Sequence, residues 1–215
     1  MKRKRKKEEN TIDKAYKGIL YPNEEQKVII AKTIGCSRFV YNRFLNERKT
    51  EYKENGRTIS YNDQCKELPG MKKDPETEWL NEVDSTALQN SVKNLQDAYD
   101  NFFLGIKEGR KVGYPRFKSK HDHRQSYRST CVKDNIRFVD SKHILLPKLG
   151  SVKCRFPKEA EGAIKNATVT REPDGSKISL KNLCYCSQGE KMERRASKGE
   201  MPQFFLVSMR LKKAQ

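Results

Sequence analysis

The chain has 215 residues, which is enough for one large domain or two small ones. Lys and Arg number 46 against 28 Asp and Glu, so the formal charge is +18, and nucleic acid is the first candidate partner, ahead of an anionic membrane surface. No apolar run approaches the ~20 residues of a membrane span, and none follows the basic N-terminus as a signal peptide would. We therefore expect an intracellular protein with no membrane partner and six free cysteine thiols.

The N-terminal half is predicted to be mostly helical after one short strand over Ala15–Leu20. Asn23 followed by Gln26 resembles a capping box, and apolar residues then recur at helical spacing. Gly35 is expected to bend or interrupt this long helix, and Asn55-Gly56 is expected to end it in a turn.

A second, short helix is predicted to begin at Ser60, with Asp63 as its capping partner, and to end near Leu68-Pro69-Gly70. A polar loop then leads to Trp79. A lone Trp beside Leu80 is more typical of a core anchor than of a ligand contact.

A third helix is predicted from the N-cap Asp84 to a stop marked by Gly105 and Gly109. One face of it is apolar, through Leu88, Val92, Leu95, Tyr99, Phe102, Phe103 and Ile106. Cations and rings follow at once, namely Arg110, Lys111, Tyr114, Arg116, Phe117 and Lys118. Composition leaves two interpretations open: a core helix followed by a solvated loop, or an element that meets nucleic acid.

The C-terminal half changes to short strand patterns. Residues 125–183 predict a small antiparallel sheet or barrel, and Val152–Phe156 alternates apolar and basic residues as a half-exposed strand does. The segment Glu172-Pro173-Asp174-Gly175 predicts a turn between two strands. Residues 184–215 match neither the helical nor the strand pattern.

Reaction chemistry is not visible in the residue pattern. The cluster His121-Asp122-His123 can hold a metal, but its Lys-rich and Arg-rich surroundings favour phosphate contact or solvation. The pair Cys184-x-Cys186 is spaced more closely than a zinc knuckle. We therefore predict no catalytic residue, no metal site and no cofactor in this chain.

The sequence does contain a consistent set of residues suited to binding nucleic acid. Lys and Arg neutralise phosphates, and Tyr114, Phe117 and Tyr127 lie among cations, an arrangement that stacks unpaired bases. Gln and Asn side chains on helices can read base edges in a groove. These features serve DNA and RNA equally.

A set of motifs points to a family. In order, they are Tyr21-Pro22-Asn23-x-x-Gln26, Gly35-x-x-Arg38-Phe39-Val40-Tyr41-Asn42, Trp79-Leu80, Ala87-Leu88-Gln89, Asn101-Phe102-Phe103, Gly113-Tyr114-Pro115-Arg116-Phe117-Lys118 and Leu146-Pro147-Lys148-Leu149-Gly150. Over roughly residues 15–183 the sequence resembles the TnpB proteins, RNA-guided DNA endonucleases of bacterial insertion sequences that are related to the type V CRISPR effectors.

The resemblance implies an α+β fold, in which a helical recognition lobe is inserted into a small antiparallel β-barrel called the wedge domain. Residues 1–20 are expected to form a basic tail and the first part of the barrel. The lobe then covers 21–117 and the rest of the barrel covers 118–183. Residues 184–215 do not resemble the family, and we expect a poorly ordered tail.

The resemblance also implies partners: a guide RNA from the transposon end, and target duplex DNA whose flanking motif the protein reads. It implies a cytoplasmic, nucleoid-associated location in a prokaryote. Tyr61 and Gln89 match the residue types of the family's motif-reading positions, whereas Cys65, Ser85, Val132 and Lys133 depart from them. The candidate nucleic-acid-binding residues are Tyr61, Gln89, Arg110, Lys111, Tyr114, Arg116, Phe117, Lys118, Tyr127, Arg128 and Lys133.

The family continues into a RuvC-like nuclease domain, with three acids that hold Mg²⁺ and a four-cysteine zinc ribbon. Its first acid lies in a strand of the form Gly-Ile-Asp-x-Gly, and no such strand follows Leu183. The resemblance therefore predicts a chain that binds guide RNA and the flanking motif but cannot cleave DNA alone. It leaves open a decayed remnant, one piece of a split protein, or a guide-dependent repressor.

Two other functions remain as alternatives. One is a DNA-binding transcriptional regulator that uses the helical lobe without RNA. The other is an active nuclease that a second polypeptide completes.

Overall fold

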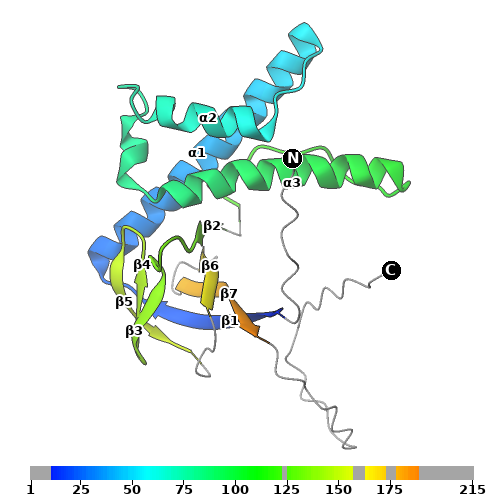
Figure 1. The fold of residues 1–215 in the computed structure, drawn as a ribbon. Coiled ribbons are helices and arrows are strands. Elements are labelled where there is room, and N and C mark those ends of the chain that lie inside the picture. The colour runs from blue at the N-terminus through cyan, green and yellow to red at the C-terminus, as the bar shows by residue number, and fades with distance from the viewer. Residues whose placement is uncertain (1–10, 123–124, 157–162, 173–177, 189–215) are drawn as a thin grey trace, which may run out of the picture.

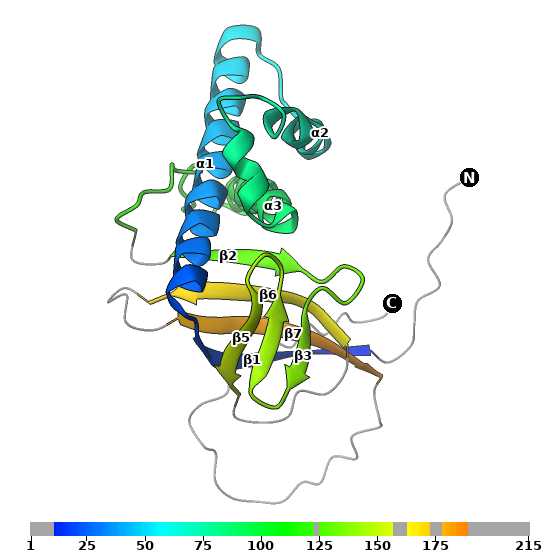
Figure 2. The same cartoon turned by 90° about the vertical axis from the view of Figure 1, so that its left-hand side faces the viewer.

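The computed structural model describes residues 11–122, 125–156, 163–172 and 178–188. A long strand comes first, three α-helices and a short 3₁₀-helix follow, and six more strands complete the order. The helices form one layer, and the strands form a single sheet beside it (Figures 1 and 2). The fold is therefore α+β, as predicted.

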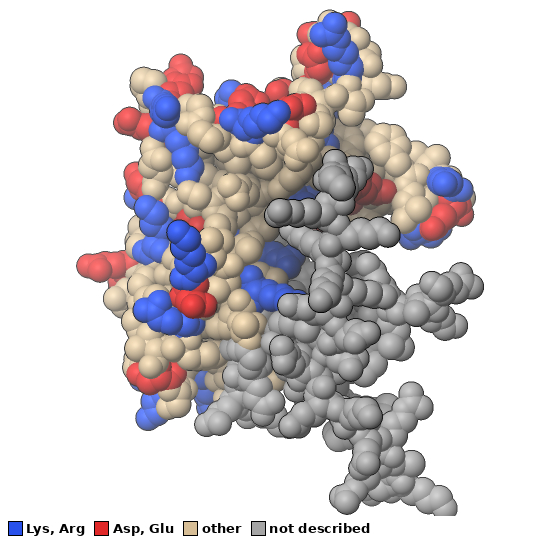
Figure 3. Space-filling model, in the orientation of Figure 1, with Lys and Arg blue, Asp and Glu red and all other residues tan. Residues whose placement is uncertain are grey.

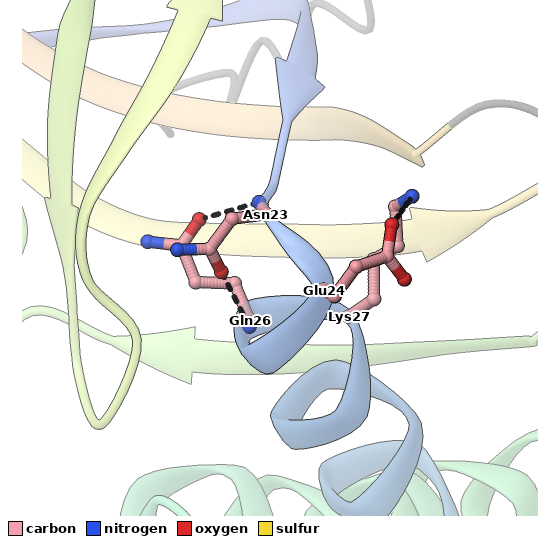
Figure 4. Close-up of polar contacts among 4 residues, drawn as sticks. All are labelled: Asn23, Glu24, Gln26 and Lys27. Carbon is pink, nitrogen blue, oxygen red and sulfur yellow. Dashed lines mark hydrogen bonds and ion pairs between the residues drawn. The ribbon is translucent and has the colours of Figure 1, made fainter.

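The first helix, α1, spans Glu24–Asn55 without a break at Gly35. Its start is the predicted capping box, in which Asn23 Oδ1 accepts the N–H of Gln26 at 2.8 Å and Gln26 Oε1 accepts the N–H of Asn23 at 3.0 Å (Figure 4). Its end is the predicted turn, where Gly56 has a φ of 63° and donates its N–H to the carbonyl of Tyr52.

The other helices begin where the sequence predicts. Helix α2 (Tyr61–Met71) is capped by the Ser60 side chain and continues through Pro69 to Met71, one residue beyond the expected stop. The 3₁₀-helix η1 (Glu78–Glu82) leads to α3 (Ser85–Lys107), and the Asp84 carboxylate caps α3 by accepting the N–H of Thr86.

Seven strands form one antiparallel sheet in the order β2-β6-β7-β1-β5-β4-β3. The first strand in sequence is β1 (Thr11–Tyr21), which lies between β7 and β5 in the interior of the sheet. The helices are therefore inserted between an interior strand and the rest of the sheet. The remaining strands are β2 (Gln125–Thr130), β3 (Arg137–Asp140), β4 (His143–Leu146), β5 (Gly150–Arg155), β6 (Ala163–Arg171) and β7 (Ile178–Gln188).

The sheet is open, so the closed barrel expected from the sequence is not confirmed. No hydrogen-bonded pairing joins the edge strands β2 and β3 in the described residues. Side chains of α3 occupy the outer edge of β2 instead: Asn90 Nδ2 donates to the carbonyl of Arg128 at 2.8 Å, and the N–H of Thr130 donates to Thr86 Oγ1 at 3.1 Å. A helix therefore protects this edge where a barrel would use another strand.

Two hydrophobic cores meet along α1. Ile30 and Ile34 in its first turns pack into the core of the sheet, whereas Val40 and Phe44 pack into the core between the helices. One rigid helix thus holds the helical layer against the sheet, and Figure 2 shows it rising from the sheet.

Three boundaries differ from the sequence prediction. Strand β7 runs to Gln188, because Thr11–Tyr16 of β1 pairs with it well beyond Leu183. Gly105 lies inside α3 rather than at its end. The apolar stripe of α3 is buried only as far as Tyr99, and Phe103 and Ile106 are exposed.

In the ranges that the structure describes, no helix is both long and apolar enough to cross a lipid bilayer.

Candidate nucleic-acid interface

Some of the candidate residues, together with neighbours that the sequence did not single out, fall into two groups at opposite ends of α3. Because α3 has 23 residues at about 1.5 Å each, these ends are roughly 35 Å apart. We call the group near the start of α3 the polar end; its members are Lys72, Ser85, Gln89 and Lys133. We call the group near its other terminus the aromatic end; its members are Lys49, Tyr99, Phe102, Phe103, Tyr114 and Phe117.

The polar end is held by contacts between α3 and β2. Asn90 Nδ2 donates to Thr130 Oγ1 at 3.0 Å as well as to the Arg128 carbonyl. The loop that carries Val132 and Lys133 leaves β2 directly after Thr130, and the N–H of Val132 donates to Asn135 Oδ1 at 2.7 Å. The first turns of α3 and this loop are therefore neighbours.

Gln89 is exposed on α3 at this end, one turn after Ser85. Lys72 Nζ, from the cap of α2, donates to Ser85 Oγ at 2.6 Å. Burial lowers the pKa of Lys72, and the positive charge of Lys148 lowers it further. Two cations thus converge beside an exposed amide, an arrangement that suits a phosphate next to a base edge.

Tyr61 and Cys65 lie one turn apart at the start of α2, half-buried against the helical core. A side-chain hydrogen bond with Cys65 raises the pKa of Tyr61. Both side chains remain partly accessible on the face that α2 shares with α3. Tyr61 and Cys65 thus lie beside the middle of α3, where the charge of Asp97 also acts on Tyr61, whereas Lys72 at the other end of α2 lies beside Ser85.

The aromatic end is a cluster of ring contacts. The Tyr114 ring meets the Tyr99 ring at 5.6 Å and the Phe102 ring at 5.2 Å, both edge to face, and the two tyrosine hydroxyls hydrogen-bond at 2.7 Å. Phe103 contacts Tyr99 at 6.3 Å and Phe102 at 5.3 Å. Burial and the hydrogen bond from Tyr114 raise the pKa of Tyr99.

A cation from α1 lies against these rings. Lys49 Nζ is 4.5 Å from the Phe117 ring centre and 5.2 Å from that of Tyr114. Three rings of the aromatic end remain accessible: Phe103 is 60%, Phe117 50% and Tyr114 42% exposed.

The loop after α3 is held by two contacts. The amide of Asn42 bonds both backbone groups of Lys118, accepting its N–H at 2.8 Å and donating to its carbonyl at 2.9 Å. Gly105 leaves room for Val112, whose Cγ2 would lie 2.3 Å from a Cβ at that position. A residue larger than glycine would therefore push the loop away from α3.

Several candidate residues have other surroundings. Tyr127 is only 5% exposed and lies in the sheet core, so its ring is not accessible to an unpaired base. Lys118 places Nζ 4.1 Å from the Tyr41 ring centre, and burial lowers its pKa. Arg110 pairs with Glu108 at 2.6 Å. Arg128, Lys111 and Arg116 are exposed but belong to neither end.

Sequence reasoning missed Lys49 and Lys72, because each is far along the chain from the residues it meets. It also placed Phe103 in the core stripe, since helical spacing alone cannot show where a neighbouring helix stops covering a face.

Charge does not mark a single surface. On the face in Figure 3, Lys and Arg side chains lie among Asp and Glu side chains, with wide areas of other residues between them. No three His, Cys, Asp or Glu side chains gather as metal ligands within the described ranges, which include His121 and Asp122 but not His123.

A family model and several known proteins match parts of this chain. A family model described as a helix-turn-helix domain, that of IS605 OrfB proteins, matches residues 11–57. In the structure these residues are β1 and α1, and the next helix starts only at Tyr61. The match therefore identifies a family, while the matched segment itself contains a strand and one unbroken helix.

Three relatives were found. "Putative RNA-guided DNA endonuclease InsQ" of Escherichia coli (strain K12) is 31% identical over 157 residues, 73% of this chain and 37% of the relative. "Putative RNA-guided DNA endonuclease" of Streptomyces pristinaespiralis is 36% identical over 115 residues, 54% of this chain and 27% of the relative. "Virulence protein VsdF" of Salmonella dublin is 33% identical over 115 residues, 50% of this chain and 94% of the relative.

The chain thus spans less than two fifths of the length of the first two relatives. The matched domain and the relatives agree with the motifs read from the sequence. The chain belongs to the TnpB family of insertion-sequence proteins and corresponds to its N-terminal portion.

Proposed function

We propose that this chain binds a guide RNA from the transposon end and reads a short motif in the duplex DNA beside the target. The family match and the relatives support the more general part of this proposal, namely that the chain is a DNA-binding part of an IS605 OrfB-type protein. In this proposal the helical layer is the recognition lobe and the sheet is the counterpart of the wedge barrel.

The observation that carries the proposal is the convergence at the polar end. Gln89 is exposed one turn from Ser85, and Lys72 donates to Ser85 at 2.6 Å. An amide can pair with a base edge in the major groove, and neighbouring lysines can hold the phosphates that set its register. The loop with Lys133 adds another cation next to the same helix.

The decisive experiment selects preferred flanks from a library of duplex DNA with a randomised segment, using the full chain loaded with transposon-end RNA. Gln89→Ala is expected to relax the preference at one position, at a cost of about 1–3 kcal/mol. Lys133→Ala is expected to weaken all sequences alike and to reduce the salt slope by about one. Gln96→Ala is the control, because Gln96 lies two turns further along α3 and bonds Asp100.

A second measurement addresses the RNA. The chain is expected to prefer transposon-end RNA over an unrelated RNA of equal length at ~150 mM salt. Equal affinity for both RNAs would contradict guide binding. Motif-dependent duplex binding in an RNase-treated sample would favour the RNA-independent regulator instead.

A further inference from the structure

The aromatic end has surface properties that the polar end does not share. Phe103, Phe117 and Tyr114 are 60%, 50% and 42% exposed, and the neighbouring Leu104 and Ile106 are exposed as well. Ring contacts join Phe103 and Tyr114 through Tyr99 and Phe102, and exposed apolar clusters of this kind mark a contact surface more often than an ordinary solvated face. This surface is formed by three segments, the second half of α1, the last turns of α3 and the loop that follows.

The charge around these rings selects the kind of partner. Lys107, Lys111 and Arg116 are exposed on the last turn of α3 and on the loop that carries the rings, whereas Arg110 is paired with Glu108 and Lys118 lies against Tyr41. Lys49 lies over two of the rings rather than beside a carboxylate. Rings with accessible faces among unneutralised cations match a partner that has both flat bases and phosphates.

The cluster is also rigid in the way that stacking requires. Tyr114 is held by its hydroxyl contact with Tyr99 at 2.7 Å and by edge contacts with two rings. The backbone of Lys118 is fixed to α1 through Asn42. A base that stacks here does not have to order a mobile loop first, which lowers the entropy cost of binding.

We propose that Phe103, Tyr114 and Phe117, with Lys49, form a stacking surface for consecutive unpaired nucleotides of a single strand. The site is separate from the polar end, and it deepens the proposed nucleic-acid function by assigning single-stranded substrate to one place. The lysine neutralises a phosphate while the rings stack bases. Stacking is tolerant of sequence, because every base has a π-face.

The test measures fluorescence anisotropy of labelled ten-nucleotide oligoadenylate, as RNA and as DNA, with the full chain. Phe103→Ala and Phe117→Ala are each expected to weaken binding about tenfold. The slope of log affinity against log salt is expected to stay unchanged in both, because stacking releases no counterions. Lys49→Gln is expected to lower that slope instead. Tyr21→Ala is the matched control, an aromatic residue 49% exposed on the sheet.

Phe103→Trp, which keeps a ring, is expected to retain affinity and thereby to separate stacking from loss of fold. The RNA and DNA arms identify which strand is preferred, and a preference for either supports the site. Unchanged affinity in both alanine variants, or a change in oligomeric state without loss of affinity, would overturn the proposal in favour of a protein contact. Neither result affects the flank selection with Gln89→Ala, and that experiment therefore tests the polar end independently.

Discussion

The two ends of α3 offer different chemistry although one helix carries both. At the polar end, an exposed amide lies near Lys72 and Lys133, and the exposed side chains in the first turns of α3 are polar. At the aromatic end, accessible rings lie around the cation of Lys49. The polar end suits the edges of paired bases, whereas the aromatic end suits the faces of unpaired ones.

The difference arises from what each end of α3 packs against. Its first half packs on the helical core and on the edge of β2, so Leu88 and Val92 are covered and only polar positions face outward. Its last turns extend past that core, so the same apolar stripe continues into solvent at Phe103 and Ile106. A long helix with a uniform stripe thus produces two unlike surfaces.

Gly105→Ala should break the aromatic end while leaving the polar end intact. A Cβ there would lie 2.3 Å from Val112 Cγ2, so overpacking is expected to cost about 2 kcal/mol and to displace the loop with Tyr114. Urea unfolding and oligoadenylate binding measure the two effects. Gly35→Ala inside α1, whose Cβ would meet nothing within 4 Å, is the control and should stabilise by about 0.5–1 kcal/mol. Stability equal to wild type in Gly105→Ala would contradict the packing argument.

Asn42→Ala should loosen the aromatic end without reshaping it. The change removes both hydrogen bonds to the backbone of Lys118, and the expected loss is about 1.5 kcal/mol. Faster amide hydrogen exchange at Lys118 is the local signature. Asn46→Ala, at an exposed position one turn along α1, should leave both quantities unchanged. Unaltered exchange at Lys118 in Asn42→Ala would show that other contacts hold the loop.

Asn90→Ala should affect the polar end of α3 and not the aromatic end. It removes the bonds from α3 to the Arg128 carbonyl and Thr130 Oγ1, which are exposed, so a loss of about 0.5–1 kcal/mol is expected. Because the loop with Lys133 leaves β2 at this point, motif-dependent duplex binding should weaken while oligoadenylate binding does not. Asn101→Ala near the aromatic end of α3 is the matched control. Equal loss of both kinds of binding would mean that the ends are coupled.

Cysteine labelling gives the smallest but most local signal. Burial raises the pKa of Cys36 and of Cys154 to about 11, so at pH 8 these thiols hold less thiolate than an ordinary cysteine and should react slowly. Cys131, half-buried directly before the loop with Lys133, should react faster. Peptide mapping by mass spectrometry should show that duplex DNA slows labelling of Cys131 and that oligoadenylate does not. Equal protection by both ligands would argue against two separate surfaces.

Local signals in the sequence were sufficient for most of the secondary structure. The capping box at Asn23 and Gln26, the cap at Asp84 and the left-handed Gly56 depend on residues within one turn, and each is where the sequence predicts it. The family motifs were likewise readable, because they are short and occur in order. The α+β class followed from the change from helical to strand periodicity after Pro115.

The arrangement of the surfaces required the tertiary structure. Lys49 reaches Phe117 across more than sixty residues of sequence, and Asn90 covers the edge of β2 where a barrel was expected to close. Periodicity assigned Phe103 to the core and composition assigned Tyr127 to the surface, and packing reversed both. Local propensity and motif order are written in neighbouring residues, whereas burial depends on which element lies opposite, and that is decided only when the chain folds.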